Sequence, residues 1–188
     1  MGLREIQNEY VRLTLDESYR ENTFGEGGVN ESVFQSLSSS ITSAARSLVS
    51  KRMGIVGNML THSKRALGSA FQEEFKTYAL LSDAPIGVNR HRIDALGFAA
   101  YLCDKKRRGG YPPSLKDMLL HETAPIKMWM KGKETMIQIH RFHPGRSIAL
   151  LNSRKSLIGA AGCPVLVRWR VSSNGDGYAW RAMRLLPL

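Results

Sequence analysis

The chain has little cysteine and no long apolar run. Cys103 and Cys163 are the only cysteines among its 188 residues, too few for a disulfide scaffold or a cysteine-based zinc site. No apolar stretch approaches the ~20 residues that a membrane-spanning helix needs, and the first residues lack the apolar core of a signal peptide. The sequence therefore predicts a cytoplasmic protein with reduced thiols.

Acidic side chains are scarce in the second part of the chain. Residues 85–188 hold 18 basic and 6 acidic side chains, a net charge of +12, whereas residues 1–84 hold 9 basic and 10 acidic ones, a net charge of −1. This excess favours an acidic partner, which is either nucleic acid or an acidic protein face. Hydrophobic residues make up 43% of the chain and charged residues 23%, which is the composition of a folded globular protein.

The middle of the chain has the periodicity of helices. Apolar residues recur at spacings of three and four after a capping position near residue 31, then over residues 63–81 and over residues 92–106. A proline pair opens a further short helix over residues 113–120. We therefore predict that residues 31–123 form a helical part.

Residues 1–30 are predicted to form a separate N-terminal segment. Alternating apolar residues indicate a short strand over residues 10–15, and three glycines in seven residues indicate a loop over residues 24–30. The loop does not follow a buried strand, and no Gly-Lys-Ser or Gly-Lys-Thr occurs in the chain. We therefore do not interpret it as a phosphate-binding loop.

After Pro125 the apolar pattern alternates, as in strands. Residues 126–131 and 136–142 are predicted as a strand and its return, and residues 165–171 form the clearest strand of the chain. The sequence Asn-Gly-Asp-Gly at residues 174–177 then predicts a hairpin turn into a partner strand. The expected fold is α+β, with the helical part followed by an antiparallel sheet over residues 124–188.

The predicted sheet has one basic and partly apolar face. On the strand over residues 165–171 the valines and Trp169 share the face expected to enter the core, while Leu166, Arg168 and Arg170 share the other. Arg181 adds a further cation from the partner strand. Such a face suits a bound peptide or a protein partner, and a peptide can also add to a sheet edge. The plain alternative is a solvated basic face, which is common on antiparallel sheets.

Residues for catalysis or metal binding form no recognisable pattern. His140 and His143 point to opposite faces if both lie on a strand, and the other histidines lie on separate segments, so we expect exposed or half-buried histidines and no metal site. Cys163 precedes a strand in a turn of small residues, where a thiol can be reactive or simply buried. We predict that the chain is not an enzyme and carries no cofactor, with catalysis by Cys163 as a minor alternative.

Two stretches resemble a known family. The sequence Asn-Ser-Arg-Lys-Ser-Leu-Ile-Gly-Ala-Ala at residues 152–161 is similar to a late Ser/Arg and small-residue stretch of the MbnC-type proteins of methanobactin biosynthesis. The block at residues 63–75 resembles the helical half of a wider group of partner proteins for iron-dependent, peptide-modifying oxygenases. The chain length and the order of helices before strands are also similar.

The resemblance implies a function for the whole chain. MbnC-type proteins are non-catalytic subunits that form a heterodimer with an iron oxygenase, and their β part resembles a peptide-recognition element that holds the leader of a ribosomal precursor peptide. The enzyme converts cysteines of that peptide to oxazolone and thioamide groups of a copper chelator, and the iron belongs to the enzyme. The residues expected to bind peptide or partner are Arg154, Lys155, Leu166, Arg168, Arg170 and Arg181.

A second function is kept as an alternative. The net charge and the basic run Lys105-Lys106-Arg107-Arg108 beside Tyr101 and Tyr111 are compatible with a nucleic-acid-binding protein, although no named DNA- or RNA-binding motif occurs. Phosphate binding of this kind weakens steeply as the salt concentration rises. Salt dependence therefore separates the two functions.

Overall fold

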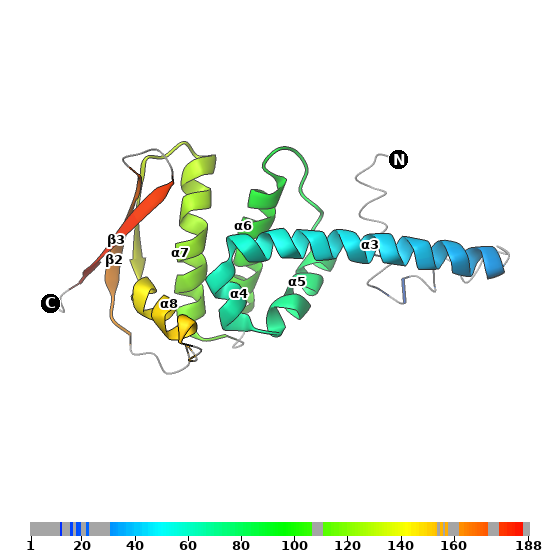
Figure 1. Cartoon of the computed structure of the whole chain (residues 1–188), viewed down its shortest axis with the longest axis horizontal. Coiled ribbons are helices and arrows are strands. Elements are labelled where there is room, and N and C mark those ends of the chain that lie inside the picture. The colour runs from blue at the N-terminus through cyan, green and yellow to red at the C-terminus, as the bar shows by residue number, and fades with distance from the viewer. Residues whose placement is uncertain are drawn as a thin grey trace. The chain divides into compact units, whose positions relative to one another are not determined.

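The computed structural model is described here for residues 12, 16, 18, 19, 22, 31–106, 111–153, 155, 157, 162–172 and 177–185, with the backbone alone for residues 31–42, 44, 45, 105 and 106 (Figure 1). The helices are α3 (Glu31–Met59), α4 (Thr61–Leu67), α5 (Ala70–Leu81), α6 (Arg90–Lys106), α7 (Pro113–Met130) and α8 (Pro144–Asn152). The strands are β1 (Thr135–His140), β2 (Val165–Val171) and β3 (Tyr178–Arg184), which form an antiparallel sheet in the order β1-β2-β3. The predicted α+β fold is confirmed.

The chain divides into two compact units, and each is built from two separate stretches. The first unit consists of Met1–Gly57 and Ser69–Asp94, and the second of Asn58–Gly68 and Ala95–Leu188. The boundary predicted between residues 123 and 124 falls inside α7, so the helical part and the β part share this helix.

In the first unit, a buried ion pair joins α3 to the first turn of α6. Nε and Nη2 of Arg52 donate to the two carboxylate oxygens of Asp94 over 3.0 and 2.9 Å, and the hydroxyl of Tyr78 lies 3.2 Å from the same carboxylate. The Arg52 guanidinium also lies 5.9 Å from the centre of the Phe75 ring, within range of a cation–π contact. Burial and the charge of Asp94 raise the pKa of Tyr78, so the phenol stays a hydrogen-bond donor.

In the second unit, α7 covers one face of the sheet (Figure 1). Ala124 and Met128 are one helical turn apart, and they pack against Val165, Val167 and Trp169 of β2 in a core of buried residues. The alternation of β2 has the expected result for most of the strand: Val165, Val167 and Trp169 face the core, and the arginines face away. Val171, which was expected on the core face, is 38% exposed at the end of the strand.

Two carboxylates of α7 accept hydrogen bonds from the backbone of neighbouring segments. The Glu122 carboxylate accepts the backbone N–H groups of His62 and Ser63 over 2.6 and 2.9 Å, and so caps the first turn of α4. The Asp117 carboxylate accepts the N–H of Phe142 over 2.7 Å. These contacts fix both α4 and the connection between β1 and α8 on α7.

Two sequence-based boundaries are wrong. Residues 126–130 are not a strand but the last turns of α7, which continues through Pro125 because Met128 completes the apolar stripe that packs on β2. The single helix predicted over residues 63–81 is instead two helices, α4 and α5. Gly68 separates them with a φ of +57°, a left-handed conformation that glycine adopts readily.

Other predictions fall partly or wholly outside the described residues. Of the strand expected over residues 10–15, only Arg12 is described, and it is helical, with its carbonyl accepting the N–H of Asp16 over 2.9 Å. The loop over residues 24–30, the turn residues 174–176 and the side chains of the basic run at residues 105–108 lie outside the description. The helix predicted over residues 92–106 is confirmed as most of α6.

Candidate binding surface

The register of the sheet brings the predicted arginines of β2 and β3 onto one face. Arg168 of β2 lies opposite Arg181 of β3 and also opposite Ile137 of β1, so the three side chains form a row across the sheet. Arg170 lies two residues further along β2, on the same face. All three arginines are exposed, and none forms an ion pair with any residue that the structure describes.

The same face carries exposed apolar side chains. Ile137 and Ile139 of β1 are 63% and 69% exposed, and Met183 of β3 is 57% exposed. Leu166 of β2 pairs with Ile139 on one side and with Met183 on the other, and it is half-buried. Large apolar side chains that remain exposed beside cations are typical of an interaction surface.

We call this surface the outer face and define it by its strand residues. They are Thr135, Ile137, Ile139, Leu166, Arg168, Arg170, Ala179, Arg181 and Met183. The outer face has no acidic member, so its cations lie among apolar side chains without local neutralisation. A segment that combines apolar and acidic side chains complements it in both respects.

The sequence pattern predicted Leu166, Arg168, Arg170 and Arg181 as members of this face, but none of the members on β1. Ile137 and Ile139 alternate with Met136 and Gln138, and this alternation would have identified them had each strand been divided into faces. The sheet also has β1 and β3 at its edges in the described residues. Edge strands can accept a further strand through backbone hydrogen bonds.

Of the predicted residues Arg154 and Lys155, only Lys155 is described, and it does not join the outer face. Arg154 lies outside the described residues. Lys155 is exposed and lines a cavity along α8, and the first turn of α8 approaches Trp180 on the inner side of the sheet. The set of residues predicted as one site is therefore divided between two places.

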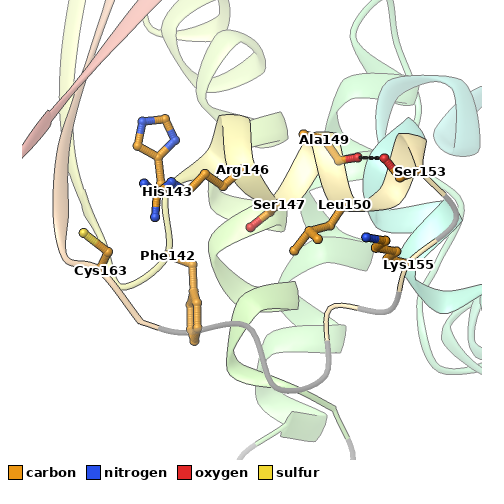
Figure 2. A pocket seen from close by; sticks show the side chains of 9 residues that line it. All are labelled: Phe142, His143, Arg146, Ser147, Ala149, Leu150, Ser153, Lys155 and Cys163. Atoms are coloured by element: carbon orange, nitrogen blue, oxygen red, sulfur yellow. Dashed lines mark hydrogen bonds between the residues drawn. The ribbon is translucent and has the colours of Figure 1, made fainter.

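The cavity along α8 has a volume of about 410 Å³ (Figure 2). Its lining combines two cations with apolar and hydroxyl side chains and one thiol. The lining residues are Phe142, His143, Arg146, Ser147, Ala149, Leu150, Ser153, Lys155 and Cys163. Cys163 is a free, half-buried thiol at this cavity.

The inner side of the sheet holds a histidine–tryptophan cluster, which consists of His121, His140, Trp169 and Trp180. The His121 ring centre lies 4.6 Å from that of Trp169, 4.7 Å from that of Trp180 and 6.1 Å from that of His140. His121 is 4% exposed and His140 is fully buried. The expectation of exposed or half-buried histidines is therefore wrong for these two. His121 lies on α7 and contacts both tryptophan rings of the sheet, and His140, the last residue of β1, packs against His121.

Burial keeps these histidines neutral. It lowers the pKa of His121 to about 3, with a further contribution from the neighbouring histidines, and it also lowers the pKa of His140. The amide of Gln138 donates to the carbonyl of Leu120 over 3.2 Å, so its oxygen faces Nε2 of His140, also over 3.2 Å. This places the His140 proton on Nε2. The cluster serves packing, and its rings are not poised to exchange protons at neutral pH.

Within the described part of the chain, no group of three or more histidine, cysteine, aspartate or glutamate side chains is placed to hold a metal ion. None of the described helices is both long enough and apolar enough to cross a bilayer. A comparison with models of known protein families finds no match, and a comparison with curated proteins finds none either.

Proposed function

We propose that the protein is a non-catalytic partner subunit that binds a precursor peptide on the outer face of its sheet and presents it to an iron-dependent oxygenase. The observation that supports peptide binding is the outer face itself, where Arg168 and Arg181 stand side by side among exposed apolar side chains. A face of this kind, flanked by an edge strand, offers both charge and apolar contacts to an extended chain.

The identity of the enzyme partner rests on the resemblance to the MbnC-type proteins. In that proposal the peptide is the leader of a methanobactin-type precursor, the partner converts its cysteines to oxazolone and thioamide groups, and the iron belongs to the partner. The complex is a heterodimer in the cytoplasm, where a free thiol such as that of Cys163 stays reduced.

The first experiment is affinity co-purification of the tagged chain with the products of its neighbouring genes, followed by iron analysis. We expect a one-to-one complex with iron in the other subunit. A chain that purifies alone under all conditions would contradict the proposal. A chain that carries nucleic acid, with binding that falls steeply as salt is raised, would replace it by the alternative function.

The second experiment tests the outer face. The double variant Arg168→Gln, Arg181→Gln removes both charges from exposed positions and should leave the fold intact, while the affinity for the peptide or for the partner falls about tenfold or more. The matched control is Lys116→Gln, which removes an exposed charge on α7. Equal binding by wild type, double variant and control would remove the outer face from the proposal.

A further inference from the structure

The cavity along α8 differs from the outer face in place and in composition. Arg146 and Lys155 line it, and none of the lining residues that the structure describes is acidic. Neither cation forms an ion pair with a residue in the described ranges. The cavity is therefore open to an anionic group from another molecule.

The two cations lie at opposite ends of the cavity. Figure 2 shows Arg146 beside His143, where α8 begins, and Lys155 beyond the other end of the helix, with Leu150 between them. Arg146 is the third residue of α8, so the helix from Arg146 to its end at Asn152 is about 9 Å long at 1.5 Å per residue, and Lys155 lies beyond that end. Anionic groups that reach both cations must therefore be on the order of 10 Å or more apart.

The part of the cavity between the cations is apolar. Phe142 is 9% exposed, and Ala149 and Leu150 line the cavity beside it. The hydroxyl of Ser153 is already engaged, because it donates to the carbonyl of Ala149 over 2.9 Å (Figure 2). A ligand with an apolar group at its middle would cover these side chains and remove them from water.

The first turn of α8 is poorly suited to phosphate. Pro144 has no N–H to offer, and the N–H groups of Arg146 and Ser147 both donate to the carbonyl of His143 over 3.1 Å. Phosphate sites at helix N-termini depend on several free backbone N–H groups. What the cavity offers at this end is the single guanidinium of Arg146. One carboxylate can pair with it through two parallel hydrogen bonds.

We propose that the cavity along α8 is a second binding site, which takes an extended acidic peptide segment with an apolar residue between two carboxylates. An extended chain rises about 3.3 Å per residue, so residues four apart are separated by about 13 Å. With the reach of the Arg146 and Lys155 side chains, two carboxylates at this spacing can contact both cations. The site is independent of the outer face, and peptide binding at one does not require the other.

The test uses the full chain labelled with ¹⁵N and two blocked pentapeptides, Glu-Ala-Leu-Ala-Glu and Gln-Ala-Leu-Ala-Gln. We expect the acidic peptide to shift amide signals around α8 and to bind about tenfold more tightly than its amide counterpart at low salt. The preference should shrink as the salt concentration is raised. Equal affinities, or shifts confined to the strands, would overturn the proposal.

Variants locate the site and separate it from the proposed function. Arg146→Gln and Lys155→Gln should each weaken binding of the acidic peptide several-fold and leave the amide peptide unaffected, while Lys116→Gln changes neither. The double variant Arg168→Gln, Arg181→Gln should keep the amide shifts around α8 that the acidic pentapeptide causes in the wild type, even if it has lost its affinity for the precursor or the enzyme. Loss of pentapeptide binding in that double variant alone, or displacement of the peptide by equimolar inorganic phosphate, would overturn the inference.

Discussion

Arg168 and Arg181 occupy directly opposite positions on β2 and β3, and both side chains are exposed. Like charges at opposed positions of an antiparallel pair destabilise the sheet. Neither arginine is compensated by an ion pair with a described residue. The pair therefore carries a cost in folding free energy that a bound acidic partner would relieve.

The first prediction concerns this pair. Arg181→Glu replaces repulsion by attraction across the strands, so the free energy of unfolding should rise by about 0.5–1 kcal/mol, while binding at the outer face is lost. Urea unfolding followed by circular dichroism gives the first quantity and titration with the precursor peptide the second. Lys116→Glu is the charge-matched control, and it should change the free energy of unfolding and the peptide affinity less than Arg181→Glu does. A less stable Arg181→Glu variant would show that the arginines have a structural role.

The second prediction concerns pH. Because burial lowers the pKa of His121 to about 3 in the folded chain, the unfolded chain binds one more proton than the folded chain between pH 3 and about 6.5. Stability should therefore be fully present above about pH 6.5 and fall as the pH decreases, with His121 alone accounting for about 2 kcal/mol at pH 5. His140 acts in the same direction, since its pKa is also lowered.

The variant His121→Phe isolates this contribution. It keeps an aromatic ring against Trp169 and Trp180 and cannot be protonated. Measured by urea unfolding at pH 7.5 and at pH 5, the variant should lose less stability between the two pH values than the wild type, by about 2 kcal/mol. Parallel losses in the two proteins would show that His121 is not responsible.

The third prediction concerns the buried ion pair of the first unit. Asp94 is 1% exposed, and Asp94→Ala would leave Arg52 buried without its counter-charge and deprive the Tyr78 hydroxyl of its carboxylate partner. The expected cost is about 3–5 kcal/mol. The double variant Arg52→Met, Asp94→Leu removes both charges and should be clearly more stable than Asp94→Ala. If the double variant is as unstable as the single one, the pair stabilises the fold through its hydrogen bonds and the contact of Arg52 with Phe75, and not merely by neutralising a buried charge.

The alternation of β2 was enough to predict which side of the strand faces the core, although Val171, on that side at the end of the strand, is 38% exposed. Val165, Val167 and Trp169 are 0%, 0% and 4% exposed, whereas Arg168 and Arg170 are exposed. This succeeded because side chains of a strand alternate between faces and one face of the sheet packs against a helix. The register was not predictable in the same way, and only the register shows that Arg168 meets Arg181 and Ile137.

The histidine–tryptophan cluster could not be predicted from spacing. His121 lies on a helix, His140 ends a strand, and Trp169 and Trp180 belong to two further strands. Their meeting depends on how α7 packs on the sheet, which no local pattern encodes. The cavity along α8 has the same origin, because Cys163 and Lys155 reach it from the connection between α8 and β2.

The last prediction concerns Pro125, after which the sequence pattern wrongly predicted a strand in place of the end of α7. A proline inside a helix removes the N–H that would bond to the carbonyl four residues earlier, here that of His121, and its ring crowds that carbonyl. The alternation of Ile126, Met128 and Met130 then suggests a strand, but Met128 is fully buried and Met130 is 38% exposed, as expected for a helix with one face on the sheet. Packing of Ala124 and Met128 on β2 outweighs the local preference.

Pro125→Ala should therefore stabilise the protein. Alanine restores the hydrogen bond to His121 and the helical propensity of that turn, so we expect the free energy of unfolding to rise by about 1–3 kcal/mol, measured by urea unfolding. Pro113→Ala is the matched control, because Pro113 is the first residue of α7, where proline has no bond to lose. It should change stability by less than about 1 kcal/mol. If Pro125→Ala is destabilising and Pro113→Ala is neutral, the proline sets a bend that the packing of α7 on the sheet requires.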